Sequence, residues 1–171
     1  GLEDAAAVIA RVEAVDITAT RSMEERAARE AGLLHDIGRE VLDAFEAAVE
    51  TQAHDLPAQA RAALKIVYSP LHGTGNVPVR EVLAHQGFTG VHVVASQEAP
   101  DGNFSTVRSP NPEERDALRL AIEQAEAEGA DLVLGTDPDC DRVGIAVRGR
   151  DGFQLFSGNQ TGALLVNYVL T

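Results

Sequence analysis

Three aspartates occupy alternate positions in one short stretch of the chain: Asp137, Asp139 and Asp141. Arg142 follows them directly, and the apolar run 130–134 before them is typical of a buried strand. Loops that leave the C-terminal ends of strands carry the ligand chemistry of α/β proteins. Three like charges so close together repel one another unless a cation neutralises them, and a planar guanidinium suits phosphate oxygens. The pattern therefore predicts a divalent metal beside a phosphate.

The spacing of the acids restricts the kind of metal. An EF-hand counted from Asp137 would need glycine and glutamate at its sixth and twelfth positions, where this chain has Arg142 and Arg148. Zinc is disfavoured because Cys140 is a single thiol that alternates with the acids. Three monodentate carboxylates suit Mg²⁺, which completes its octahedron with water or phosphate oxygens. A solvated acidic turn without a ligand is the alternative.

Composition excludes several classes of function. The chain has 171 residues, of which 44% are hydrophobic and 24% charged, as in ordinary soluble globular proteins. The net charge of −13 argues against nucleic acid and anionic membranes as partners. No apolar run reaches the roughly 20 residues that span a bilayer, and the single cysteine cannot form an internal disulfide. We therefore expect a cytoplasmic protein that binds neither nucleic acid nor membrane.

Hydrophobic periodicity predicts an α/β fold. Five short runs are typical of strands: 64–68, 91–94, 130–134, 143–147 and 153–156. The patterns typical of helices lie over 3–14, 33–49, 77–86, 112–129 and from about 159, and a polar connector covers 52–63. Asn76 is an expected helix N-cap, and Asn111 begins an expected capping box. We expect βαβ units with a mainly parallel mixed sheet flanked by helices, preceded by further helices.

A second loop, residues 69–76, also joins a predicted strand to a predicted helix, and it contains His72 and Gly73. Its backbone N–H groups would be in position to face an anion, so these two residues are candidates for substrate binding. The loop matches neither a P-loop nor a dinucleotide fingerprint. A tight turn with a hydrogen-bonded histidine is the alternative. The other four histidines show no metal-ligand spacing and are expected to be structural or exposed.

Four segments together resemble the α-D-phosphohexomutases, and the phosphoglucomutase branch in particular: 65–80, 109–114, 135–144 and 158–160. Their sequences are KIVYSPLHGTGNVPVR, SPNPEE, GTDPDCDRVG and GNQ. The resemblance covers about residues 38 to 171. The chain starts without methionine and stops inside an apolar-periodic segment, so we expect a piece of a longer protein.

The resemblance implies a four-domain enzyme around a cleft. Residues 38–156 would be its metal-binding second α/β domain. Residues 1–37 would be the end of the preceding domain with a helical linker. Residues 157–171 would start the helix that leads into the third domain. The partners would then be a phosphosugar substrate and the remaining domains of the same chain.

The resemblance also implies roles for the aspartate stretch. Asp137, Asp139 and Asp141 would bind Mg²⁺, and Arg142 would be a catalytic contact to phosphate. The family reaction interconverts glucose 1-phosphate and glucose 6-phosphate through a phosphoserine enzyme. Its intermediate and activator is glucose 1,6-bisphosphate. Phosphomannomutases and phosphopentomutases of the same superfamily are the alternative activities.

The sequence departs from the family pattern in two respects. Cys140 stands where the family usually has alanine, which leaves the three acids in place. The Thr-x-Ser-His-Asn-Pro nucleophile motif is absent, and the stretch 109–112 lacks its histidine; the Gly-Glu-x-Ser-Gly sugar-selecting loop is absent too. Without the serine, we expect the isolated chain to be inactive.

Two further classes of function are alternatives. A haloacid-dehalogenase-like phosphatase also uses aspartates with Mg²⁺, but it needs a downstream lysine, and no lysine follows Asp141. A non-catalytic module that binds metal or phosphosugar would reuse the same fold for binding alone.

Overall fold

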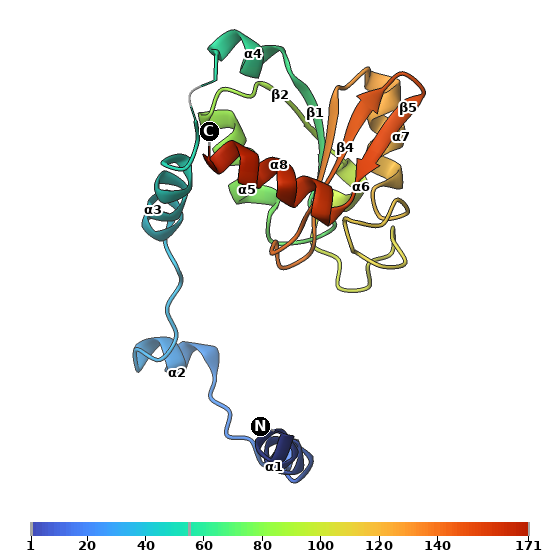
Figure 1. Ribbon diagram of the computed structural model, residues 1–171. Helices are drawn as coiled ribbons and strands as arrows, with labels where there is room; N and C mark the ends of the chain where they lie inside the picture. The colour runs from blue at the N-terminus through green and yellow to red at the C-terminus, as the bar shows by residue number, and fades with distance from the viewer. Residues whose placement is uncertain (1, 55, 171) are drawn as a thin grey trace. The chain divides into compact units, whose positions relative to one another are not determined.

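The computed structural model describes residues 2–54 and 56–170 and divides the chain into two compact units, 1–38 and 39–171. The first unit holds three helical elements: α1 (Leu2–Glu13), η1 (Ile17–Ala19) and α2 (Glu25–Glu30). The second unit contains the sheet and the remaining helices (Figure 1). Within the described residues, no helix is long and apolar enough to cross a membrane.

The helix expected over 33–49 is wrong in its first part, because α3 (Arg39–Glu50) begins only at residue 39. Gly32, just after α2, adopts a φ of 67°. The N–H of Leu33 donates to the carbonyl of Ala28 across the last turn of α2. This Schellman pattern ends α2 and starts a non-helical segment. The apolar spacing from residue 33 therefore does not mark a helix, because Gly32 ends α2 and the chain is not helical again until residue 39.

The second unit is built on a five-stranded sheet in the order β2-β1-β3-β4-β5. The strands are β1 (Lys65–Ser69), β2 (Gly90–Val93), β3 (Leu132–Thr136), β4 (Val143–Gly149) and β5 (Gly152–Phe156). Strands β2, β1 and β3 are parallel, whereas β4 and β5 are antiparallel to their neighbours. The expected α/β fold with a mixed sheet is confirmed, with two of its four pairings antiparallel.

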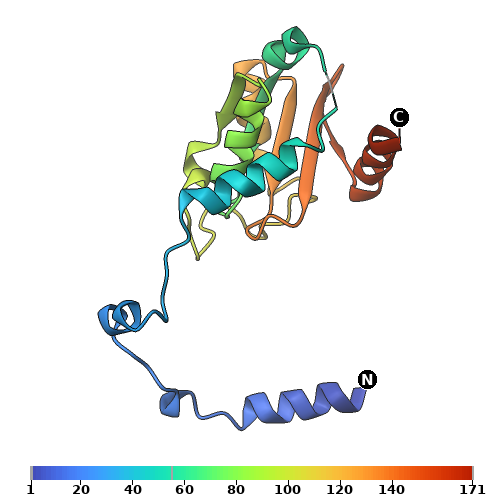
Figure 2. The same cartoon turned by 90° about the vertical axis from the view of Figure 1, so that its left-hand side faces the viewer.

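The change of direction within the sheet follows from connection length. The parallel strands are linked through helices, as parallel crossovers require. By contrast, a short loop joins β3 to β4 and a turn joins β4 to β5, which places both pairs antiparallel. The helices of this unit, besides α3, are α4 (Ala58–Ala63), α5 (Asn76–His85), α6 (Ala95–Glu98), α7 (Arg119–Glu128) and α8 (Gly158–Leu170). Helix α8 contacts β4, and it begins close to the end of β5 (Figures 1 and 2).

The main core lies between α7 and one face of the sheet. Ile122 and Ala125 of α7 are buried in one cluster with Val67 of β1 and Val133 of β3. Val67 and Val133 are register partners, so they lie on the same face. The cluster continues through Ala146 to β5. This packing fixes the end of β3, from which the aspartate loop departs.

Two predicted helix starts and one predicted connector are wrong. α7 starts at Arg119 and not at 112, because the Asn111 side chain accepts from the N–H of Glu113 at 3.1 Å and closes a turn there. The N-cap position of α5 is Gly75, while the Asn76 amide donates to the carbonyl of Glu98. The predicted connector 52–63 contains the short helix α4.

Helices α3 and α5 meet through charged side chains. Arg39 of α3 forms an ion pair with Glu81 of α5 at 2.7 Å, and its other terminal nitrogen lies 3.3 Å from Glu46. His85 of α5 lies 2.8 Å from Glu50 of α3. Glu46 is buried, and one of its carboxylate oxygens has no hydrogen-bond partner. Burial, followed by a hydrogen bond with Glu81, raises the pKa of Glu46, so this carboxyl gains a proton more readily than an ordinary glutamate.

Glu46→Gln should therefore flatten the pH dependence of stability. A raised pKa means that the contribution of Glu46 is present at low pH and is lost as the pH rises above 4.5 and through the raised pKa. Glutamine keeps a neutral donor toward Glu81 at every pH. We expect the variant to gain Tm relative to wild type as the pH rises, measured by circular dichroism. Glu40→Gln, exposed on the same helix, is the control. Parallel pH profiles for wild type and Glu46→Gln would contradict this account.

Candidate metal centre

The aspartate loop connects β3 to β4 and covers residues 137–142. The N–H of Cys140 donates to the carbonyl of Asp137 at 3.0 Å, which closes the turn. Cys140 has a φ of 61°, an uncommon value for a residue with a side chain. Its thiol faces residue Gly75, since a Cβ built there would lie 2.8 Å from the sulfur. The cysteine therefore packs against the neighbouring loop and is not part of the acidic group.

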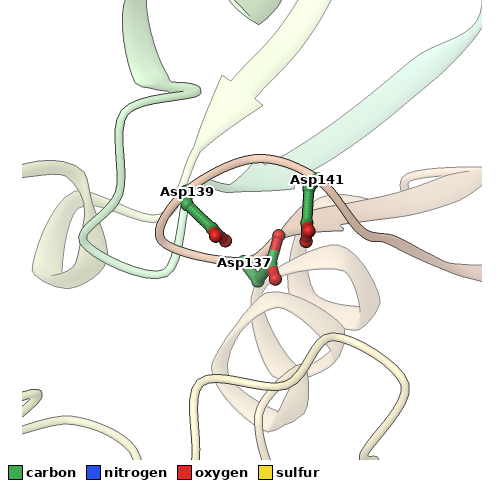
Figure 3. A group of neighbouring side chains, drawn as sticks. All are labelled: Asp137, Asp139 and Asp141. Carbon is green, nitrogen blue, oxygen red and sulfur yellow. The ribbon is translucent and has the colours of Figure 1, made fainter. Parts of the chain in front are cut away.

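The structure brings the three predicted acids together. Figure 3 shows Asp137, Asp139 and Asp141 pointing toward one another from the loop. One carboxylate oxygen from each lies within 4.8 Å of the others. Asp137 is fully buried, whereas Asp139 and Asp141 are exposed. Among residues 2–54 and 56–170, no other group of three His, Cys, Asp or Glu side chains has this geometry.

Arg142 holds Asp137 in its charged form. The backbone N–H of Arg142 donates to Oδ1 at 2.9 Å, and its Nε donates to Oδ2 at 2.7 Å. Burial opposes ionisation of Asp137, but these hydrogen bonds outweigh it and lower the pKa of the carboxyl. The pKa of Asp141 is raised, because it shares a hydrogen bond with Asp137 and lies beside the charges of Asp139 and Asp137. Arg142 also lies 3.7 Å from Asp141, so three carboxylates share the charge of this one guanidinium.

This donor set fits Mg²⁺. The three carboxylates offer hard oxygen atoms, which Mg²⁺ and Ca²⁺ prefer, and they leave the exposed side open for water or phosphate. The neighbouring thiol is turned away, so the site lacks the soft ligands typical of zinc. Asp137 would be the fixed, buried ligand, while Asp139 and Asp141 would complete the carboxylate set from the exposed side.

The second predicted loop, residues 69–76, packs against the aspartate loop. Both ring nitrogens of His72 are taken, by the carbonyl of Ala99 at 2.8 Å and by the hydroxyl of Thr106 at 2.7 Å. The backbone N–H groups of His72, Gly73 and Thr74 donate to the carbonyls of Gln97, Pro70 and Pro138. These donors are therefore satisfied within the protein. Gly73 lies directly against Pro138 of the aspartate loop.

Two residues that lie beneath the site were not predicted from the sequence. The hydroxyl of Tyr68, at the end of β1, is 2.8 Å from the hydroxyl of Thr136, which precedes Asp137. Burial raises the pKa of Tyr68 to about 12. Strand alternation places such residues only once the parallel pairing of β1 with β3 is known. The two glycines at 73 and 75 were the signal in the sequence for close approach between the loops.

Comparison with known proteins identifies the family to which the chain belongs. A family model described as "Phosphoglucomutase/phosphomannomutase, alpha/beta/alpha domain II" matches residues 42–152. The chain belongs to this family. A phosphoglucomutase of Staphylococcus haemolyticus (strain JCSC1435) is 42% identical over 136 residues, which cover 79% of this chain and 24% of that protein. A phosphoglucomutase of Staphylococcus aureus (strain USA300) is 46% identical over 109 residues, or 63% of this chain and 20% of that protein.

Solved structures agree on the fold. A putative phosphomannomutase from Thermus thermophilus has a TM-score of 0.60 at 24% identity, over 75% of this chain and 28% of its own. A phosphoglucomutase/phosphomannomutase family protein from Burkholderia thailandensis has a TM-score of 0.58 at 23% identity, over 76% of this chain and 26% of its own. The chain spans about a quarter of the length of these relatives. The predicted membership of the phosphohexomutase superfamily, in its phosphoglucomutase branch, is confirmed.

Two aspartate variants should separate stability from metal binding. Asp137→Asn should lower the stability of the metal-free protein by about 1 kcal/mol, because it removes a buried charge that Arg142 compensates. Asp139→Asn should change stability by no more than about 0.5 kcal/mol, because this side chain is exposed among like charges. Both variants should weaken Mg²⁺ binding, measured by the Tm shift that added MgCl₂ produces. Equal stability losses in the two variants would contradict the assigned roles.

Proposed function

We propose that the full-length protein carrying this chain is a phosphoglucomutase. It would interconvert glucose 1-phosphate and glucose 6-phosphate through a phosphoserine and a glucose 1,6-bisphosphate intermediate. The observation that carries the proposal is the convergence of Asp137, Asp139 and Asp141 beside Arg142, within the segment that matches the family model. The relatives named phosphoglucomutase make glucose phosphates the first substrates to test.

This chain would supply the metal half of the site. The three aspartates would hold Mg²⁺, which neutralises charge on a transferring phosphoryl group. Arg142 is half exposed beside them, so part of its guanidinium remains available to a phosphate oxygen. Asp137 orients that guanidinium through Nε and leaves its terminal nitrogens for the phosphate. The nucleophilic serine is absent from residues 1–171, so the isolated chain is expected to be inactive.

The division of the chain is part of the same proposal. Residues 38–156 would be the second, metal-binding domain, after a preceding domain end and linker over 1–37. Residues 157–171 would begin the helix that leads to the third domain. The family match over 42–152 supports the central part of this division. A cytoplasmic location, a phosphosugar substrate and contacts with the other domains of the same chain belong to the proposal as well.

Arg142→Ala in the full-length protein should reduce kcat on glucose 1-phosphate by about 10²–10³-fold, the usual loss for one donor to a developing charge. Arg150→Ala is the matched control, since Arg150 is exposed on the turn at the other end of β4. Both variants should keep the wild-type circular dichroism spectrum. An unchanged rate in Arg142→Ala would remove this residue from the mechanism. Parallel assays on mannose 1-phosphate and ribose 1-phosphate test the sugar assignment.

A second prediction concerns metal binding by the isolated chain. Three carboxylates alone leave half of an octahedron to water, and the missing phosphoserine would supply the strongest remaining ligand. We therefore expect weak Mg²⁺ binding in titration calorimetry, which inorganic phosphate strengthens. Tight binding without any phosphate would contradict the proposal that the metal needs a phosphate ligand in addition to the three carboxylates.

A further inference from the structure

The loop of residues 69–76, which we call the supporting loop, donates two hydrogen bonds to one carbonyl oxygen of the aspartate loop. The backbone N–H of Thr74 donates to the carbonyl oxygen of Pro138 at 2.9 Å. The hydroxyl of Thr74 donates to the same oxygen at 3.2 Å. Pro138 lies between two of the three acids. Two donors from one residue therefore converge on the carbonyl of the peptide unit that joins Pro138 to Asp139.

The orientation of that carbonyl is set by a single rotatable backbone angle of Pro138. The proline ring fixes φ of Pro138 near about −65°, which leaves ψ as the only soft backbone angle at the residue. The direction of the carbonyl oxygen defines ψ. By holding the oxygen, Thr74 fixes how the chain continues into Asp139 and hence where that carboxylate lies relative to Asp137.

The two loops also approach too closely for side chains between them. A Cβ on Gly73 would lie 2.4 Å from Cα of Pro138. A Cβ on Gly75 would lie within 2.8 Å of the hydroxyls of Tyr68 and Thr136. The supporting loop therefore contacts the backbone of the aspartate loop at Gly73, while Gly75 lies against side chains of β1, β3 and the aspartate loop.

The conformation of the supporting loop is strained and held by many contacts. Leu71 and His72 have φ values of 46° and 64°, a region that residues with side chains rarely adopt. The buried hydroxyl of Ser69 donates to Gln97 at 2.7 Å, and both ring nitrogens of His72 are bonded to protein atoms. Such strain persists only where the surroundings enforce it, and it gathers at functional sites.

We propose that Thr74 is a positioning residue of the metal site: it sets the geometry of the aspartate loop before the ion binds. This inference rests on the proposed function, because it assigns a role toward the same metal. Thr74 itself is exposed, so its hydroxyl contributes little to the core. Its effect should therefore appear in metal affinity and not in global stability.

The test measures Mn²⁺ binding, followed by the electron paramagnetic resonance signal of the free ion, in the full-length protein. Thr74→Val keeps the shape of the side chain but removes the hydroxyl donor. We expect it to raise the Kd for Mn²⁺ about two- to tenfold, the effect of one hydrogen bond, with an unchanged Tm. Thr74→Ser restores the donor and should bind as wild type does. Thr89→Val is the control, because the exposed Thr89 hydroxyl also donates to a carbonyl, that of Ala62, before β1 and away from the site.

Gly73→Ala provides a second, independent variant. Its added methyl should displace Pro138 and weaken Mn²⁺ binding more than Thr74→Val does, whereas Gly102→Ala, which has open space around it, should bind normally. An unchanged Kd in Thr74→Val, or an equal loss in Thr89→Val, overturns the positioning role while leaving the metal site intact. Wild-type protein that binds Mn²⁺ no better than Asp137→Asn would overturn the metal site itself and this inference with it.

Discussion

The candidate site depends on keeping one buried carboxylate ionised. Asp137 is withdrawn from water, which would normally favour its neutral form. Arg142 reverses this preference with one backbone and one side-chain hydrogen bond, each to a different oxygen. The anion that results is fixed in position, and the two exposed acids are arranged around it. Removing the Arg142 contacts would leave a buried charge without compensation, so the residue serves the structure as well as the proposed chemistry.

The sheet makes this arrangement possible through its change of direction. β3 is the last parallel strand and the first with an antiparallel neighbour. Its C-terminal end therefore carries a short return loop in place of a long crossover. Meanwhile β1 ends beside it and sends out the supporting loop at the same edge. The aspartate loop and the supporting loop therefore meet at this edge of the sheet, and the geometry of the site depends on both.

Much of the fold could be predicted from the sequence, because strands, helices and the aspartate loop have strong local patterns. The errors lie where a capping residue or a glycine acts on a different element from the one that the sequence pattern indicated. Asn111 caps a turn and not α7, and the glycine after α2 stops a helix that the apolar spacing continued. The convergence of the acids followed from their alternation within one short loop. The contact between Thr74 and Pro138 joins residues 64 positions apart, and it depends on strand pairing that no local pattern specifies.

Tyr68 gives the protein a built-in optical probe. The chain has no tryptophan and two tyrosines, so its near-ultraviolet signal is simple to assign. The hydroxyl of Tyr68 contacts Thr136, the residue that leads directly into the aspartate loop. A shift of that loop would change the environment of the buried phenol, and with it the absorbance and emission of the ring. Events at the acids can therefore be followed by ultraviolet spectroscopy without attaching a label.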